Sequence, residues 1–255
     1  TEAAKLRGGA APAPASTPSA RPKAKSSATA DLFDQGASDD MGDDAQASPE
    51  TVTAVATQYD TVLDWPTFDR WLARLQAAEL VAFDTETDSL DAMQARIVGL
   101  SFSDQVGEAC YIPLRHEGVD APAQLPLDEV LARLKPWLED ASRPKLGQHI
   151  KYDTHVLANH GIALAGIAHD TMLQSYVIES DKGHDLGQLC TRHLGLATIA
   201  YEDLCGKGAK QIGFDQVDIE RAATYAAEDA DVTLRVHNVL HPQFADEPGL
   251  SRIYH

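Results

Sequence analysis

The period of the hydrophobic positions changes several times along the chain. Over residues 67–79 (TFDRWLARLQAAE), Phe68, Leu72 and Leu75 recur at helical spacing, which predicts an amphipathic helix. Three short runs rich in β-branched and aromatic residues follow, separated by the turn-like segments DSLDAM and DQVG. We expect these runs to form three successive strands paired as an antiparallel meander: 80–86, 95–103 and 108–114.

Helical spacing returns at 125–140 (LPLDEVLARLKPWLED), where Pro126 lies near the start and therefore costs no hydrogen bond. The segment 143–150 (RPKLGQHI) is a predicted short strand. Further helices are predicted over 153–160, 171–180, 185–194 and 217–240, with the glycine- and lysine-rich stretch 205–213 as a loop. Three strands, a helix, a strand and more helices together predict an α/β domain whose mixed central sheet is flanked by helices.

Residues 1–53 lack this patterning. They contain almost no large aliphatic side chains, so they cannot offset the entropy that is lost when a backbone becomes ordered. Between Asp31 and Glu50 there are seven acidic residues and no Lys or Arg, which makes the segment self-repelling. We expect a disordered acidic linker over 1–53 and a folded domain over 54–240.

The formal net charge of the chain is −18 at pH 7. Phosphate binding normally requires a basic surface, so this charge argues against a nucleic-acid partner. The objection weakens for an enzyme that grips a few nucleotides through divalent cations, because such a site needs carboxylates and another domain can supply the basic surface. The charge therefore disfavours a nucleic-acid enzyme without excluding that class.

Several other classes are disfavoured by the distribution of cysteine, histidine and apolar residues. The three cysteines show no CxxC spacing, so neither a disulfide framework nor a thiolate zinc site is predicted. The ten histidines show no HExxH-type spacing. No run approaches the roughly 20 apolar residues of a membrane span, and the N-terminus lacks the apolar core of a signal peptide. We expect a soluble cytoplasmic protein with no membrane partner.

Two carboxylates share one face at the end of the first predicted strand of the meander. Asp84 and Glu86 are two residues apart, so the period of a strand points both side chains the same way. Like charges this close repel each other unless a divalent cation neutralises them. The alternative is that the pair begins a solvent-exposed turn, since loops at strand ends are commonly polar.

The predicted helix 217–240 carries an acidic residue on its apolar side. Its expected buried face consists of Ala222, Tyr225, Asp229, Val232 and Val236. Its expected polar face consists of Glu220, Thr224, Glu228, Asp231 and Arg235. An unpaired buried carboxylate costs several kcal/mol. Asp229 therefore requires a cation, a core Arg or backbone N–H donors, and Tyr225 projects beside it from one turn earlier.

Asp153 and Asp170 each lie where a strand is expected to pass into a helix. Asp is a favoured residue at a helix N-cap, because its carboxylate accepts hydrogen bonds from the free amides of the first turn. The residues alone therefore identify both as caps.

Four strings change this interpretation: FDTETDSL (83–90), GQHIKYD (147–153), HDTMLQSY (169–176) and YAAEDADVT (225–233). In this order and at these intervals, they closely resemble the proofreading domain of bacterial family A DNA polymerases. The resemblance covers roughly 55–240 and includes every carboxylate and the tyrosine of that DEDD exonuclease family.

The resemblance implies a ribonuclease H-like fold. It also implies that two Mg²⁺ or Mn²⁺ ions are held by four carboxylates: Asp84, Glu86, Asp153 and Asp229. A site made of oxygen ligands suits such hard cations, and two of them about 4 Å apart can activate water and stabilise the departing 3′ oxygen of a phosphodiester. Tyr225 would orient the attacking water through its hydroxyl, in keeping with a free pKa near 10.

The resemblance also indicates residues that contact the substrate. Leu90 matches a position that wedges against the terminal base, and Gln148 matches one that contacts the strand. Tyr201 is a candidate stacking face for a base, or alternatively a packing aromatic. Lys207 and Lys210 are candidates to contact phosphates, although GKGAK lacks the spacing of a Walker A loop.

Two features depart from the family pattern. His149 stands where Asn is expected after Gln148, and the segment 181–185 (DKGHD) is short and lacks an expected Arg. Both departures concern strand binding and leave the four carboxylates unchanged.

The implied function is removal of nucleotides from the 3′ end of single-stranded DNA, giving nucleoside 5′-monophosphates, within a larger polymerase of the bacterial cytosol. Residues 241–255 would then begin a polymerase domain, and the acidic linker would lead from an upstream 5′-nuclease domain. Two alternatives remain. The domain is a structural spacer that has lost catalysis, or it is a free-standing RNA-trimming exonuclease of the same fold, because no motif here visibly reads the 2′-OH.

Overall fold

The computed structural model describes residues 56–118 and 121–255. The predicted acidic linker lies outside the described residues. The described part is built around a mixed sheet with strand order β1-β4-β3-β2-β5-β6. Its strands are β1 (Gln58–Thr61), β2 (Val81–Thr87), β3 (Ile97–Gln105), β4 (Glu108–Pro113), β5 (Lys145–Gly147) and β6 (Ile167–Asp170).

The antiparallel meander predicted from the sequence is confirmed. Strand β3 pairs antiparallel with both β2 and β4, whereas β1, β5 and β6 each join the sheet in parallel. Parallel neighbours require crossover connections, and helices supply them. The expected α/β architecture with a mixed central sheet is therefore the one observed.

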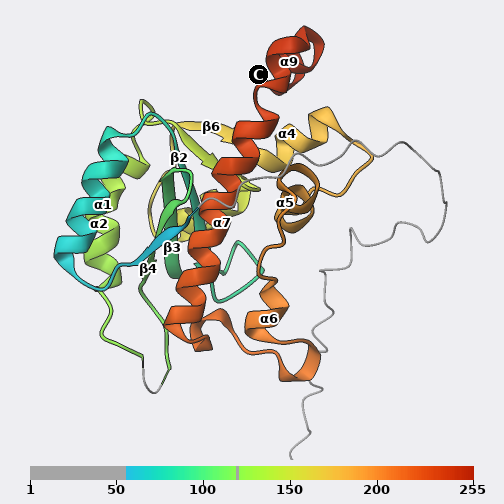
Figure 1. Ribbon diagram of the computed structural model, residues 1–255. Helices are drawn as coiled ribbons and strands as arrows, with labels where there is room; N and C mark the ends of the chain where they lie inside the picture. The colour runs from blue at the N-terminus through green and yellow to red at the C-terminus, as the bar shows by residue number, and fades with distance from the viewer. Residues whose placement is uncertain (1–55, 119–120) are drawn as a thin grey trace, which may run out of the picture. The chain divides into compact units, whose positions relative to one another are not determined.

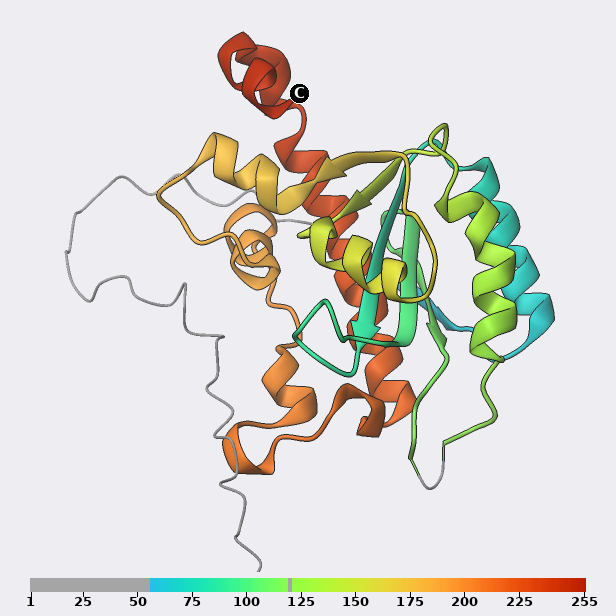
Figure 2. The ribbon, with the colours of Figure 1, turned by 180° about the vertical axis from the view of Figure 1, so that it is seen from behind.

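Helices cover both faces of this sheet (Figures 1 and 2). One face is covered by α1 (Trp65–Ala77), α2 (Leu127–Leu138) and α3 (Ile150–Asn159), and the other is crossed by the long helix α7 (Ile219–Leu240). The remaining helices are α4 (Thr171–Ile178), α5 (Leu186–Leu194), α6 (Tyr201–Cys205), α8 (Gln243–Asp246) and α9 (Pro248–Tyr254), with short 3₁₀ turns at Gly208–Lys210 and Phe214–Gln216.

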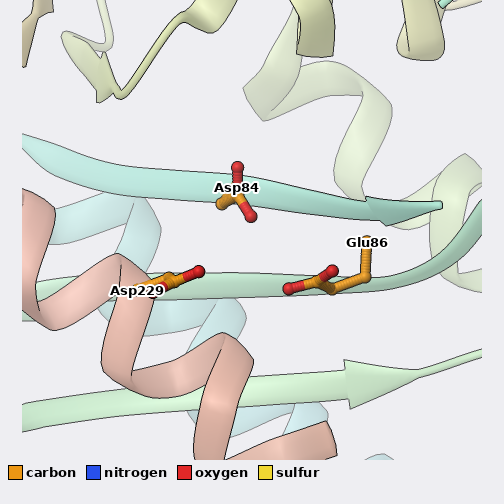
Figure 3. Close-up of side chains that lie close together, drawn as sticks. All are labelled: Asp84, Glu86 and Asp229. Atoms are coloured by element: carbon orange, nitrogen blue, oxygen red, sulfur yellow. The ribbon is translucent and has the colours of Figure 1, made fainter. Parts of the chain in front are cut away.

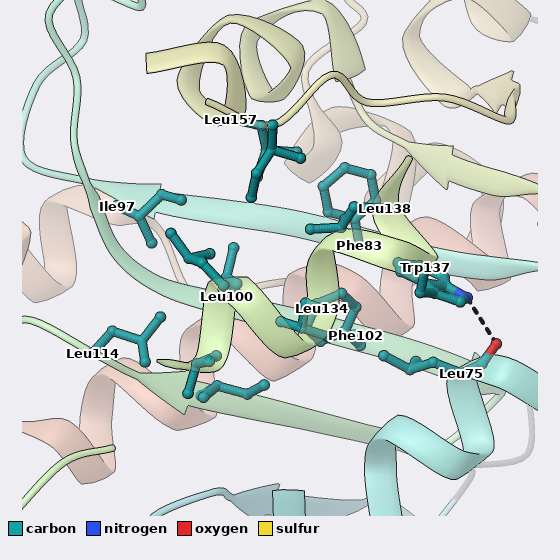
Figure 4. Close-up of a cluster of buried hydrophobic side chains, with 14 of the residues drawn as sticks. Leu75, Phe83, Ile97, Leu100, Phe102, Leu114, Leu134, Trp137, Leu138 and Leu157 are labelled. Atoms are coloured by element: carbon teal, nitrogen blue, oxygen red, sulfur yellow. Dashed lines mark hydrogen bonds between the residues drawn. The ribbon is translucent and has the colours of Figure 1, made fainter. Parts of the chain in front are cut away.

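The main hydrophobic core lies between the sheet and the α1–α2 pair (Figure 4). Phe83 and Phe102 stack across β2 and β3, and Trp137 of α2 meets Phe102 edge-on. The indole N–H of Trp137 donates to the carbonyl of Leu75 at 2.9 Å, which joins α2 to α1. Because strand side chains alternate, burying Phe83 on this face sends Asp84 to the opposite face, toward α7.

Aspartates begin several of the helices. Asp64 caps α1, Asp185 caps α5 and Asp218 caps α7, each by accepting from first-turn amides. Asp170 accepts from the amide of Leu173 and so caps α4, as predicted. No helix in the described part of the chain is long and apolar enough to cross a membrane.

The boundaries of the elements around the second string, 147–153, differ from expectation. The strand predicted over 143–150 is only three residues long, and α3 begins at Ile150 rather than 153. His149 precedes α3 in the left-handed conformation, with φ 59°. Asp153 therefore lies inside the first turn of α3, and its interpretation as an N-cap is wrong.

The polar face predicted for α7 is also wrong in part. Asp231 is completely buried, because β1 and the turn between β3 and β4 cover that side of the helix. Its carboxylate accepts from the Tyr59 hydroxyl and the Gly107 amide, both at 2.8 Å, and pairs with Arg235 at 2.6 Å. A charged residue that appeared solvent-exposed from its helical spacing thus joins three elements.

Candidate active site

Three carboxylates meet between β2 and α7. Asp84 and Glu86 project from the same face of β2, as their spacing predicted, and Asp229 projects toward them from α7 (Figure 3). One oxygen of each carboxylate lies within 4.8 Å of the others. Asp84 and Asp229 are half-buried, whereas Glu86 is only 7% exposed. The interpretation of Asp84 and Glu86 as a solvent-exposed turn is therefore wrong.

Burial and mutual repulsion make this group of carboxylates unfavourable when it is negatively charged. Burial raises the pKa of Asp84 to about 7. Burial also raises the pKa of Glu86 well above its ordinary value, and the charges of Asp84 and Asp229 raise it further. The pKa of Asp229 rises for the same reasons, burial first and Asp84 second, although the Tyr225 hydroxyl beside it acts to lower it.

The residues of this cluster fit a hard divalent cation. Glu86 Oε1 is buried and has no hydrogen-bond partner within the described part of the chain. Such an atom is costly to bury unless something binds it. The ligands on offer are carboxylate oxygens, which Mg²⁺ and Mn²⁺ prefer. A bound cation would both satisfy Glu86 and neutralise the repulsion.

Asp153 reaches the same strand from the first turn of α3, at the edge of β2 beyond its pairing with β5. It is 1% exposed, and one of its oxygens accepts from the Thr85 amide at 3.0 Å and from the Thr85 hydroxyl at 2.7 Å. Thr85 stands between Asp84 and Glu86 but faces the opposite way. Asp153 is therefore tied to the strand that carries the cluster without belonging to the group of three. Burial, and secondarily the charge of Asp84, raise its pKa.

Tyr225 stands one helical turn before Asp229, as predicted. It is half-buried and packs beside Phe214, with ring centroids 6.0 Å apart. Burial, followed by the charges of Asp229, Glu86 and Asp84, raises its pKa above its ordinary value. Its hydroxyl consequently stays protonated and can donate or accept a hydrogen bond.

The residues expected to contact substrate differ in how exposed they are. Leu90 is 79% exposed on the loop between β2 and β3, where the Tyr152 hydroxyl donates to the neighbouring Ser89 carbonyl. Gln148 is turned inward, because its Nε2 donates to the His184 carbonyl at 2.7 Å and its Oε1 accepts from Thr171.

Tyr201 and the lysines lie in and after α6. Tyr201 is half-buried, and its ring stacks at 6.4 Å on Phe214. It therefore packs as an aromatic of the domain, and its role as a stacking face for a base stays a prediction. Lys207 is exposed and pairs with Glu202. Lys210 is exposed at the end of a 3₁₀ turn. The structure thus brings three carboxylates and Tyr225 together, places Asp153 at the edge of the same strand beside Thr85, and leaves the two lysines on the surface.

The two departures from the family pattern have physical consequences. His149 adopts a left-handed conformation that Asn tolerates better than most residues. In the short segment 181–185, a Cβ on Gly183 would lie 1.6 Å from the side-chain oxygen of Gln188. Gln188 therefore fills the space that a side chain at 183 would need.

Sequence reasoning missed Thr85, which holds Asp153. The available signal was the position of its hydroxyl, because Thr85 follows Val81 and Phe83 on the apolar face of the strand. A buried hydroxyl there needs an acceptor, and Asp153 supplies it.

Comparison with known proteins assigns the chain to a family. A family model described as 3′–5′ exonuclease matches residues 59–245. The chain belongs to the 3′–5′ exonuclease family of DNA polymerase I. It is 52% identical over 217 residues to DNA polymerase I of Pseudomonas aeruginosa, an alignment that covers 84% of this chain and 24% of that protein. The chain therefore spans about a quarter of the length of this curated relative.

Solved structures of this exonuclease fold are similar in shape at low sequence identity. The polymerase domain of Pol1 from M. smegmatis superposes with a TM-score of 0.58 at 20% identity, covering 76% of this chain and 29% of that one. Brucella melitensis NrnC with bound Mg²⁺ superposes with a TM-score of 0.51 at 20% identity, covering 76% and 84%. At such identities the likeness concerns the fold, and it agrees with the ribonuclease H-like architecture expected from the sequence.

Proposed function

We propose that this exonuclease domain removes nucleotides from the 3′ end of single-stranded DNA as nucleoside 5′-monophosphates, and that it is the proofreading part of a DNA polymerase I. The observation that carries the proposal is the convergence of Asp84, Glu86 and Asp229, with an oxygen of Glu86 buried and unpartnered. A structural spacer has no reason to keep three repelling carboxylates in one partly buried place.

The carboxylates divide naturally between two Mg²⁺ or Mn²⁺ ions. We assign one ion to the group of three and the second to Asp84 together with Asp153, which accepts from Thr85 of the same strand. The Mg²⁺ named in the NrnC structure is in keeping with this choice of metal. When bound, two such ions supply an activated water and charge stabilisation at both the attacked phosphorus and the leaving oxygen.

The chain's own groups position the reactants. The Tyr225 hydroxyl, kept protonated by its surroundings, orients the attacking water beside Asp229. Leu90 presents an exposed apolar side chain to the terminal base from an anchored loop. Gln148 uses one N–H of its amide on His184, which leaves the second for the strand.

The more distant substrate contacts are assigned by accessibility. Lys210 is exposed and is proposed to contact a phosphate, and Lys207 can join it if its pair with Glu202 opens. Tyr201 supports Tyr225 through Phe214, with which both rings pack.

The parent protein supplies what the domain lacks. The alignments cover only 24% and 21% of the DNA polymerase I of two relatives, so we propose that polymerase and 5′-nuclease domains belong to the same chain in the bacterial cytosol. In that arrangement residues 1–53 link to the 5′-nuclease domain and 241–255 begin the polymerase domain. Because the net charge is −18, we expect the basic surface that grips DNA to lie largely on these other domains.

The test is metal-dependent release of 5′-mononucleotides from 3′-labelled single-stranded DNA, with an RNA oligonucleotide of the same sequence in parallel. We expect release from DNA in Mg²⁺ or Mn²⁺ and none in a chelator. Faster release from RNA would favour the RNA-trimming alternative. A folded, metal-saturated chain that releases nothing at low salt would favour the spacer.

A further inference from the structure

A second buried atom near the carboxylate cluster lacks a partner. Besides Glu86 Oε1, the hydroxyl oxygen of Ser101 in β3 has no hydrogen-bond partner within the described part of the chain, and Ser101 is 0% exposed. Burying a hydroxyl without a hydrogen-bond partner destabilises the folded state. An alanine at this position would avoid that cost, so the serine calls for an explanation.

Ser101 stands directly opposite Asp84. The two residues are paired in the antiparallel register of β2 and β3, and Ser101 is paired on its other side with Tyr111 of β4. Residues that pair across strands share one face, with Cβ atoms about 4.5–5.5 Å apart. Asp84, Ser101 and Tyr111 therefore form a row on the α7 face, and rotation about the Ser101 side chain brings its hydroxyl within reach of the Asp84 carboxylate.

The hydroxyl of Tyr111 already donates its hydrogen bond to another residue. His116 Nδ1 lies 3.0 Å from the Val217 carbonyl, which only accepts, so that nitrogen carries the proton. Burial lowers the pKa of His116, which keeps its other nitrogen unprotonated. His116 Nε2 consequently accepts from Tyr111 at 2.8 Å. Along this row the free donor is Ser101, and the charged acceptor next to it is Asp84.

We propose that Ser101 is a positioning residue of the metal centre, which donates its hydroxyl hydrogen to the Asp84 carboxylate and holds it in the orientation that binds the cation. This inference rests on the proposed function, because it takes Asp84 to be a metal ligand. Carboxylates that bind metals are themselves oriented by hydrogen bonds, and loss of such a partner typically weakens metal binding about 10–100-fold.

The same strand offers a matched control. Ser103 is also 0% exposed and lies two residues further along the same face of β3. Its hydroxyl donates to the Glu108 carbonyl at 2.9 Å, and it pairs across the sheet with Ala82 rather than with a carboxylate. The Ser103 hydroxyl therefore has a hydrogen-bond partner in the backbone but no carboxylate opposite it. Ser101 has the carboxylate opposite it but no hydrogen-bond partner.

The experiment compares the full-length wild type with the single variants Ser101→Ala and Ser103→Ala. Titration calorimetry measures their affinity for Mn²⁺, and urea unfolding in chelator measures their stability without metal. We expect Ser101→Ala to bind Mn²⁺ about 10–100-fold more weakly, to unfold at an unchanged or higher urea concentration, and to recover excision at high Mn²⁺. Ser103→Ala should lose stability and keep its Mn²⁺ affinity.

Two results would overturn the inference: unchanged Mn²⁺ affinity in Ser101→Ala, or an equal loss in Ser103→Ala. Ser101→Cys provides a second variant of similar size with a weaker donor, and its affinity should fall between those of serine and alanine. Failure of the proposed function is distinguishable, because the wild type would then neither bind Mn²⁺ nor release nucleotides.

Discussion

Replacing Asp84 with Asn should stabilise the metal-free protein, and by an amount that grows with pH. The folded-state pKa of Asp84, about 7, lies above its ordinary value of 3.8. The folded state therefore binds the proton more tightly than the unfolded state, so the stability associated with this group is full below about pH 4 and is lost as the pH rises toward 7. An amide of the same shape does not titrate and removes this loss.

The magnitude follows from the size of the pKa difference. At about 1.4 kcal/mol for each pH unit, the complete loss by pH 7 corresponds to roughly 4 kcal/mol. Asp84→Asn removes this loss, so we expect a gain of up to about 4 kcal/mol at pH 7.5 and of about 1 kcal/mol at pH 4.5. Removing a charge at a functional site commonly gains stability in this way.

The assay is urea unfolding of wild type and Asp84→Asn at several pH values between 4.5 and 8, in chelator and again in Mn²⁺. Asp203→Asn is the control, because Asp203 is an exposed acid on α6 outside the cluster. In Mn²⁺ the order should reverse, since only the wild type gains stability by binding the ion. A variant that is less stable than wild type in chelator at pH 7.5, or a difference that does not change with pH, would show that the buried charge of Asp84 does not destabilise the fold.

Further predictions concern single side chains. Asp231→Ala should cost about 3–5 kcal/mol in urea unfolding, because it leaves Arg235, whose side chain is only 11% exposed, without its partner; a cost below 1 kcal/mol would contradict the role given to Asp231. His149→Asn should raise stability by up to about 1 kcal/mol, because the short side chain of Asn adopts the left-handed conformation more readily than other non-glycine residues, and a loss of stability would count against strain there. Tyr225→Phe should lower kcat for excision about 10–100-fold with little change in KM or in melting temperature, whereas a change in KM alone would point to strand binding.

The strands and helices with regular periods were predictable from the sequence, and the edge elements were not. β2, β3 and β4 are apolar runs bounded by turn residues, so their pairing as a meander followed from the pattern. β1 reads QYDT and β6 reads IAHD. Such short, half-polar edge strands carry no alternation, and neighbouring strands rather than their own residues decide that they are extended.

The residues of the candidate site also differ in whether local periodicity could place them. Asp84 and Glu86 could be placed on one face from their spacing, and Asp229 from the period of α7. The position of Asp153 depended on where α3 starts, which His149 determines by an unusual backbone conformation that the sequence pattern did not reveal. The burial of Asp231 depended on the packing of β1 and the β3–β4 turn, which lie far away in the chain. The proposed role of Ser101 depends on the register of β2 and β3, which places it opposite Asp84.

Whether the carboxylate cluster is the catalytic metal centre is decided by the rate of mononucleotide release from 3′-labelled single-stranded DNA, compared for wild type, Asp229→Ala and Glu220→Gln. Glu220 is an exposed acid in the first turn of α7 and serves as the matched control. Metal-dependent release by the wild type and Glu220→Gln, with a loss of at least about 100-fold in Asp229→Ala, is the predicted result. Release at an undiminished rate by folded Asp229→Ala would contradict the assignment of the carboxylate cluster as the catalytic metal centre.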